Sequence, residues 1–192
     1  MEKVVLASNN AGKLREFREI LEGLFEIVSL RELGLEADPE ETGSSFAENA
    51  RIKAEYSCRL SGLPALADDS GLEVDALGGA PGIYSARYAP GTDADRVVKL
   101  LQDMENVEKR TARFVSVVAL VYPDGRQVTA RGTCEGVITR QPQGAGGFGY
   151  DPIFLPDGYD QTFGLLSAET KNSISHRGRA VRALRDKLNL SR

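Results

Sequence analysis

Histidine and cysteine are scarce in this chain of 192 residues, which has one histidine and two cysteines. Cys58 and Cys134 lie far apart in the sequence and form no C-x-x-C pair. Together with His176 alone they cannot make a zinc site of the usual Cys/His type. Any metal ion held by this protein would therefore be bound through oxygen atoms.

Long apolar runs are also missing. No segment approaches the roughly eighteen consecutive apolar residues of a membrane-spanning helix. The short apolar run that follows Met1 ends at Ser8, and it lacks the longer apolar core of a secretory signal. We therefore expect a soluble, cytoplasmic protein with no membrane partner.

Excess positive charge is absent as well. The chain has 24 Lys and Arg against 28 Asp and Glu, a net charge of −4, with no basic stripe. Generic binding of DNA or RNA depends on such charge, so we expect no long nucleic acid as a partner. The hydrophobic content of 41% and the charged content of 27% are typical of globular proteins. The length predicts a single domain over residues 1–192, built as one body or as two tightly joined lobes.

The hydrophobic pattern predicts an α/β protein with a mixed sheet. A helix with apolar residues at Leu14, Phe17 and Ile20 follows the first strand, and Ser45 begins a second helix through a capping box with Glu48. The turn at 123–125 joins two strands into a hairpin, which brings in antiparallel pairing. We expect strands at 4–7, 26–30, 63–67, 111–122 and 127–139, a helix at 95–104, and one last helix that carries Ile174, Val181, Leu184 and Leu188.

The segment Ser8-Asn9-Asn10-Ala11-Gly12-Lys13 stands where the first strand gives way to a helix. Helix N-termini favour anions, because their N–H groups are unpaired and the helix dipole is positive there. A lysine in the first turn is disfavoured by about 0.3–1 kcal/mol unless an anion lies nearby. Lys13 thus indicates a phosphate site, although the segment is not a Walker A loop. The alternative is an Asn-rich turn with a solvated lysine.

Four carboxylates form a second candidate site. Glu40 and Glu41 lie in a loop before a helix, and Asp68 and Asp69 follow the apolar residues 63–67. Acidic residues at the carboxyl end of a strand are well placed to hold Mg²⁺ against a phosphate. The alternatives are a solvated acidic loop for the glutamates and a plain turn for the aspartates.

A glycine-rich segment at 144–149 matches G-x-G-x-x-G literally, but it leads to Asp151-Pro152 and an extended apolar run. A dinucleotide loop must open a helix, so we reject that interpretation. The segment can instead present Phe148 for stacking on a base and Asp151 for accepting a hydrogen bond from it. The alternative is that Phe148 and Tyr150 are core residues.

Donor groups gather in the segment 171–177, which contains Lys171, His176 and Arg177. Lysine and arginine have no acceptor atoms, so the pair suits a ligand that carries a carbonyl group and discriminates against an amino group. The alternative is a basic, solvated helix turn. Serine hydrolase chemistry is excluded, because the chain has no G-x-S-x-G motif.

Taken together and in order, these segments resemble the Ham1/RdgB family of inosine triphosphate pyrophosphatases. The resemblance runs from Ser8 nearly to the C-terminus. Each motif alone is weak, but six in register are highly specific. The landmarks are residues 8–13, Glu41-Thr42-Gly43 with 46–54, Asp68-Asp69-Ser70-Gly71-Leu72 with 74–77, Pro81-Gly82-Ile83-Tyr84-Ser85-Ala86-Arg87-Tyr88, 148–154 and Ser175-His176-Arg177.

The resemblance implies an elongated two-lobed α/β fold around a long mixed β-sheet, with the active-site cleft between the lobes, usually assembled as a homodimer. It implies Mg²⁺-dependent hydrolysis of non-standard purine nucleoside triphosphates such as ITP, dITP and XTP to the monophosphate and pyrophosphate, which cleanses the nucleotide pool.

The resemblance also assigns roles to residues. Asp69 is the implied general base, and Glu41 and Asp69 are the implied Mg²⁺ ligands. The implied substrate-binding residues are Ser8, Asn9, Asn10, Ala11, Gly12, Lys13 and Lys53 on the triphosphate side, Ser70 beside Asp69, and Phe148, Gly149, Tyr150, Asp151, Lys171, His176 and Arg177 around the base.

Two positions depart from the family pattern. A frequent glutamate is Leu165 here, and an asparagine often found in the helix after residue 88 is Arg96. Neither departure falls on a residue assigned to catalysis. Two other functions stay open: a nucleotide sensor without turnover, and a broader pyrophosphatase that acts on standard or modified pyrimidine triphosphates.

Overall fold

Strong apolar patterning at the N-terminus produces the first βα unit. Val4, Val5 and Leu6 are fully buried in strand β1, and Asn10 caps helix α1 by accepting a hydrogen bond from the Lys13 N–H.

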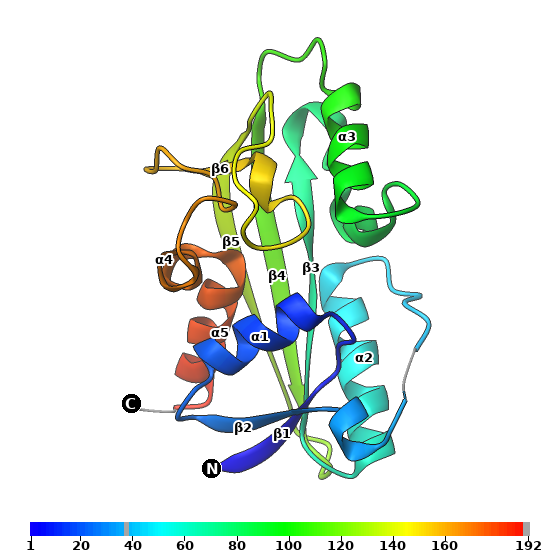
Figure 1. The fold of residues 1–192 in the computed structure, drawn as a ribbon. Helices are drawn as coiled ribbons and strands as arrows, with labels where there is room; N and C mark the ends of the chain where they lie inside the picture. The colour runs from blue at the N-terminus through cyan, green and yellow to red at the C-terminus, as the bar shows by residue number, and fades with distance from the viewer. Residues whose placement is uncertain (37–38, 190–192) are drawn as a thin grey trace. The chain divides into compact units, whose positions relative to one another are not determined.

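A computed structural model describes residues 1–36 and 39–189 (Figure 1). The strands are β1 (Glu2–Leu6), β2 (Phe25–Ser29), β3 (Ala65–Val74), β4 (Thr111–Val121), β5 (Gln127–Ile138) and β6 (Phe154–Pro156). The α-helices are α1 (Ala11–Ile20), α2 (Phe46–Ser61), α3 (Asp93–Asp103), α4 (Ala168–Ile174) and α5 (His176–Lys187).

The strands form a six-stranded mixed sheet in the order β2-β1-β3-β4-β5-β6. Strand β1 is parallel to β2 and to β3, whereas β5 is antiparallel to β6. The turn between β4 and β5 is closed by a hydrogen bond from the Tyr122 N–H to the Arg126 carbonyl. The predicted α/β class and mixed sheet are confirmed.

The chain divides into two compact units. The first comprises Met1–Asp69, Ser116–Gly132 and Arg177–Arg192, and the second comprises Ser70–Val115 and Thr133–His176. Strands β3, β4 and β5 each contribute one part to the first unit and one part to the second.

The core of the first unit is an apolar cluster shared by α1, α5 and the strands. Phe17 and Leu21 of the α1 region pack with Val181 of α5 and with Leu66 and Val118 of the sheet. Figure 1 shows α2 on the far side of β3 from α1 and α5. This arrangement holds α1 and α2, which carry Lys13 and Lys53, against strand β3.

Strand β3 is longer than the sequence predicted. The expected strand ended at Ala67 and placed Asp68 and Asp69 after it, but the observed strand continues to Val74. The pairing of β1 with β3 ends at Leu66, so the two aspartates lie where the parallel neighbour stops rather than where the strand stops. The sequence did not predict that β3 continues past Ala67, because the Asp, Ser and Gly residues that follow locally favour turns.

The core of the second unit is rich in aromatic residues. Phe114 lies against Phe154 with ring centroids 4.6 Å apart, and it stacks on His176 at the same distance. Phe163 completes the group, with its centroid 5.1 Å from that of Phe154. Offset and edge-on aromatic pairs of this kind stabilise a core beyond the area that they bury. This core supports the segments on both sides of the glycine-rich loop.

Helix ends in the structure both confirm and correct the prediction. Ser45 caps α2 by accepting from the Glu48 N–H, but the Glu48 carboxylate binds Ser44, so the predicted capping box is only half formed. The prediction of a single last helix is wrong, because Ser175 is extended and separates α4 from α5.

Among the described residues, no helix has the length and apolar character needed to span a membrane.

Candidate functional site

Two side chains cap backbone N–H groups at the start of α1, where β1 ends. Ser8 Oγ accepts from the Asn10 N–H at 3.2 Å, and Asn10 Oδ1 accepts from the Lys13 N–H at 3.0 Å. Asn9 and Ala11 are exposed at this turn, and Gly12 is buried in the first helical turn. The first N–H groups of a helix point outward and favour an anion.

Lys13 is paired with a buried carboxylate. Its Nζ lies 2.7 Å from Oδ2 of Asp68, whose side chain is fully buried. Ser116 Oγ donates to Oδ1 of the same carboxylate at 2.5 Å. The alternative of a solvated lysine is therefore wrong, and in this structure the anion beside Lys13 is Asp68. A side chain held in this way keeps its ammonium group near the start of α1.

Arg177 belongs to the same cluster. Its Nε lies 3.4 Å from Asp68 Oδ2, and its Nη1 donates to Glu16 Oε2 at 2.7 Å. Burial by itself would raise the pKa of the Asp68 carboxyl, but the charges of Lys13 and Arg177 hold it well below its usual range. These contacts lie in the first unit, whereas the sequence grouped Arg177 with Lys171.

Asp69 faces the other side of β3, because side chains alternate along a strand. Its Oδ1 accepts from Lys53 Nζ of α2 at 2.8 Å, and the same Nζ lies 3.3 Å from Glu41 Oε1. The Lys13 charge also acts on Asp69, where it favours the ionised carboxylate. The structure thus brings Glu41, Lys53, Asp69 and Lys13 into one electrostatic cluster within the first unit.

The second oxygen of Asp69 is buried without a partner. Within the part of the chain that the structure describes, Oδ2 is inaccessible and accepts no hydrogen bond. Burial raises the pKa of this carboxyl against the opposing charge of Lys53. An uncompensated buried carboxylate oxygen is costly, and it favours a site that receives a positive charge or a proton when a ligand binds.

A divalent ion fits these residues. Residues 1–36 and 39–189 contain no group of three or more His, Cys, Asp or Glu that could enclose a metal. Mg²⁺ does not need one, because it is commonly held by one or two carboxylates together with substrate phosphates and water. Glu41 and Asp69 supply two such carboxylates. Glu40 is exposed, and Ser70 follows Asp69 in β3 and is partly buried.

The second unit holds a separate cluster around the glycine-rich loop. Lys171 Nζ lies 2.6 Å from Asp151 Oδ2, and this oxygen also accepts from the Phe148 N–H at 2.9 Å. The Lys171 ammonium lies 5.1 Å from the centroid of the Phe148 ring. Phe148 is partly exposed, and its ring lies within cation–π distance of this ammonium.

The sequence predicted that this loop is not a dinucleotide-binding loop, and the structure confirms it. Residues Asp151–Ile153 form a short 3-10 helix that leads into β6, so no long helix follows the glycines. Gly147 has a φ of +71°, and a Cβ there would lie 1.9 Å from Asp151 Oδ2. The glycine is needed because the backbone approaches the carboxylate that binds Lys171.

Three predicted base-site residues are deeply buried. Tyr150 is a core residue, and its hydroxyl donates to the Ser85 carbonyl at 2.7 Å. Lys171 and His176 are 4% and 2% exposed, so the alternative of a solvated basic turn is wrong for both. Gly149 is partly exposed at the end of the loop.

Sequence reasoning missed Ser116 and Glu16. Ser116 is a single hydroxyl in the otherwise apolar run of β4, which was the available signal that this strand carries a buried polar contact. Glu16 lies one turn after Lys13 on α1 and is 8% exposed. Its burial depends on the contact with Arg177, which is distant in sequence.

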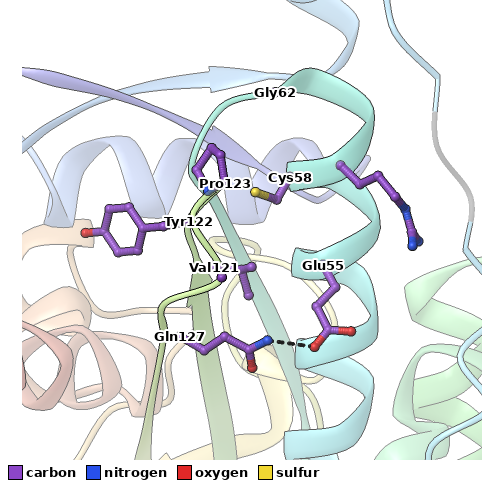
Figure 2. Close-up of a pocket in the computed structure, with 9 residues that line it drawn as sticks. Glu55, Cys58, Gly62, Val121, Tyr122, Pro123 and Gln127 are labelled. Atoms are coloured by element: carbon purple, nitrogen blue, oxygen red, sulfur yellow. Dashed lines mark hydrogen bonds between the residues drawn. The ribbon is translucent and has the colours of Figure 1, made fainter.

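The first unit also carries a groove that none of the predicted site residues lines. Figure 2 shows Glu55 and Cys58 of α2 facing the β4–β5 turn at Pro123, with a hydrogen bond from Gln127 Nε2 to Glu55 at 2.9 Å. Its lining includes the cation Arg59 and the anion Glu55, so it lacks the clustered cations that a triphosphate requires.

Comparisons with known proteins agree with the resemblance read from the sequence. The model of the Ham1 family matches residues 4–187. A "dITP/XTP pyrophosphatase" of Symbiobacterium thermophilum is 54% identical over 187 residues, covering 94% of this chain and 91% of the relative. One from Pseudomonas aeruginosa is 51% identical and covers 99% and 98% of the two chains.

Two solved structures are similar over nearly their whole length. A HAM1 protein from Coxiella burnetii has a TM-score of 0.88 and 43% identity, covering 100% of each chain. The Ham1 protein of Staphylococcus aureus has a TM-score of 0.87 and 43% identity, covering 98% of each chain.

Proposed function

Because the chain belongs to the Ham1 family, we propose that it is a nucleoside-triphosphate pyrophosphatase that acts on dITP, ITP and XTP. The observation that carries the proposal is the environment of the Asp69 carboxylate: one oxygen accepts a hydrogen bond from Lys53, and the other is buried with no hydrogen-bond partner among the described residues. Two lysines that neutralise phosphate charge and one carboxylate that can orient water are what phosphoanhydride hydrolysis requires. The names of the curated relatives support the choice of substrates.

Mg²⁺ would be held by Glu41 and Asp69. When bound, the ion would neutralise phosphate charge and make the phosphorus more electrophilic. Its positive charge would also compensate the buried Asp69 carboxylate, which the described part of the chain leaves half-satisfied.

The residues of the first unit would act on the triphosphate. Lys13, held beside Asp68, and Lys53, held beside Asp69, would bind phosphate oxygens together with the N–H groups at the start of α1. Asp69 would orient a water molecule and accept its proton as the water attacks. The bond between the α and β phosphates breaks, and the products are the nucleoside monophosphate and pyrophosphate.

The residues of the second unit would recognise the purine. Phe148 would stack on the base, and Lys171 would donate to the 6-keto oxygen while Asp151 keeps the ammonium in place. An amino group at this position would place a donor against the Lys171 ammonium, which has no acceptor atom to offer it. We also propose, on the family resemblance, that the enzyme works as a cytoplasmic homodimer.

Incubation of the protein with a panel of triphosphates tests this function. We expect pyrophosphate, and no orthophosphate, from ITP, dITP and XTP in the presence of Mg²⁺. A site built to hydrogen-bond a keto group should prefer these substrates to ATP by at least about 100-fold in kcat/KM. Removal of the metal with EDTA should abolish turnover, and readdition of Mg²⁺ should restore it.

The same panel identifies the competing functions. Orthophosphate as the main product would contradict cleavage between the α and β phosphates. Equal turnover of pyrimidine triphosphates would show a broader pyrophosphatase. Binding of nucleotide without any product would show a sensor, and the proposal would then be wrong.

A further inference from the structure

Asp93 ties the glycine-rich loop to a helix that is distant in sequence. It is the first residue of α3, and its Oδ2 accepts from the Gly149 N–H at 2.8 Å. Its other oxygen, Oδ1, accepts from Arg96 Nη2 at 2.7 Å. Both contacts lie within the second unit. No role was assigned to Asp93 from the sequence, and Arg96 was noted there only as a departure from the family pattern.

Arg96 holds the Asp93 carboxylate through the oxygen that does not bind Gly149. Its Nη1 donates to the carbonyl of Gly91 at 3.0 Å and lies 3.4 Å from that of Ala89, and its side chain is largely buried. The arginine therefore connects the segment before α3 with the carboxylate that holds Gly149. A charge-assisted pair of this kind is stronger than a neutral hydrogen bond, and the planar guanidinium restricts its direction.

The two peptide groups that flank the Phe148 Cα are both bound to carboxylates. The N–H of Phe148 donates to Asp151 Oδ2 at 2.9 Å, and the N–H of Gly149 donates to Asp93. Each carboxylate is held by a cation, Lys171 for Asp151 and Arg96 for Asp93. Because peptide groups are planar, fixing both of them fixes φ and ψ of Phe148 and hence the direction in which its ring leaves the backbone.

We propose that Asp93, held by Arg96, is a positioning residue that sets the orientation of the Phe148 ring for stacking on the nucleobase. The inference rests on the proposed function, in which Phe148 is the stacking surface. Asp93 does not touch the substrate, and it acts through the Gly149 peptide group. Its removal should therefore weaken nucleotide binding and leave the chemical step unchanged.

Asp95 provides a matched control on the same turn of α3. Its carboxylate accepts from the N–H and the hydroxyl of Thr92 at 2.6 and 2.7 Å, and this capping box closes the start of the helix. Loss of Asp95 therefore weakens α3 without removing a hydrogen bond from the loop. An effect that follows from damage to α3 alone would appear in Asp95→Ala as well as in Asp93→Ala.

Amide hydrogen exchange and steady-state kinetics of Asp93→Ala, Asp93→Asn and Asp95→Ala test the proposal. In Asp93→Ala we expect exchange in the segment 144–150 to be about tenfold faster, and KM for ITP to be about tenfold higher with kcat unchanged, as loss of one charge-assisted hydrogen bond predicts. Asp93→Asn, which keeps an acceptor oxygen, should fall between Asp93→Ala and the wild type. Asp95→Ala should show faster exchange at the start of α3 and an unchanged KM.

Three results would overturn the proposal. Unchanged exchange in segment 144–150 of Asp93→Ala would show that Asp93 does not hold the loop. Faster exchange with an unchanged KM would show that the held loop does not position the ring. An equal rise of KM in Asp95→Ala would assign the effect to α3 as a whole. A wild-type protein that releases no pyrophosphate from any triphosphate would instead refute the proposed function, while the exchange data would still show whether Asp93 holds the loop.

Discussion

Asp69→Asn is expected to lower kcat for ITP by about 1,000-fold, because the variant loses both the proposed proton acceptor and one carboxylate of the proposed metal site. The amide oxygen can still accept from Lys53, so the lysine should stay in place and nucleotide binding should remain measurable. Pyrophosphate release measures the loss of turnover, and titration calorimetry with ITP measures the binding that is kept.

Glu40→Gln is the matched control for this variant. Glu40 is also acidic and precedes Glu41 in the same loop, but its side chain is exposed. Its neutralisation should leave kcat and KM at wild-type values. Full activity of Asp69→Asn would remove Asp69 from the mechanism. Equal losses in Asp69→Asn and Glu40→Gln would show that overall charge, rather than the position of Asp69, determines the rate.

Lys13→Ala is expected to have two separable effects. The variant loses a cation that we propose binds phosphate, so KM for ITP should rise by about 100-fold, in line with loss of a strong charge-assisted contact. It also breaks a buried ion pair, since Asp68 is fully buried beside Lys13. Asp68 keeps Arg177 as a charge partner, so the free energy of unfolding should fall by less than the about 3–5 kcal/mol lost when a buried charge is left without any compensation. Kinetics and urea denaturation measure the two effects independently.

The double variant Lys13→Ala with Asp68→Asn distinguishes binding from folding. It removes both partners, and the Arg177–Glu16 ion pair remains to balance its own charges. Most of the lost stability should therefore return, while KM should stay high because no cation is restored. Recovery of KM together with stability would refute the role of Lys13 in phosphate binding, and unchanged kinetics in Lys13→Ala alone would refute it too.

Local sequence signals predicted most of the element order. The apolar run before Ser8, the cap at Ser45 and the turn chemistry at 123–125 each act over a few residues, and the structure has a strand, a helix start and a turn at these places. Rejection of the G-x-G-x-x-G match was also correct, because only a short 3-10 helix and strand β6 follow the glycines, although Asp151, the residue before Pro152, lies in that 3-10 helix rather than in an extended segment. Such signals need no knowledge of distant contacts.

Features that depend on distant contacts could not be predicted in this way. Strand β3 runs through Asp68 and Asp69, where its neighbour in the sheet is β4 and both carboxylates pair with cations of other helices, Lys13 and Lys53. Arg177 was grouped with Lys171 because the two are close in sequence, but its carboxylate partners are in the first unit. The break at Ser175 is flanked by Ile174 and His176, neither of which is a glycine or a proline.

The candidate residues came from two sources. Spacing and chemistry indicated an anion site at Lys13 and acidic residues at Asp68 and Asp69, but they did not distinguish the two aspartates. The structure distinguishes them, because both Asp68 oxygens are paired, with Lys13 and Ser116, whereas one buried Asp69 oxygen has no hydrogen-bond partner in residues 1–36 and 39–189. The assignment of Asp69 as the base had rested on the family resemblance alone.

A crystal structure of the wild-type protein with Mg²⁺ and an ITP analogue that cannot be cleaved between the α and β phosphates is the most direct test of the account. It should show phosphate oxygens bound by Lys13 and Lys53, the ion on Glu41 and Asp69, and the purine against Phe148. A triphosphate bound away from Lys13 and Lys53, or an ion that does not contact Asp69, would contradict it.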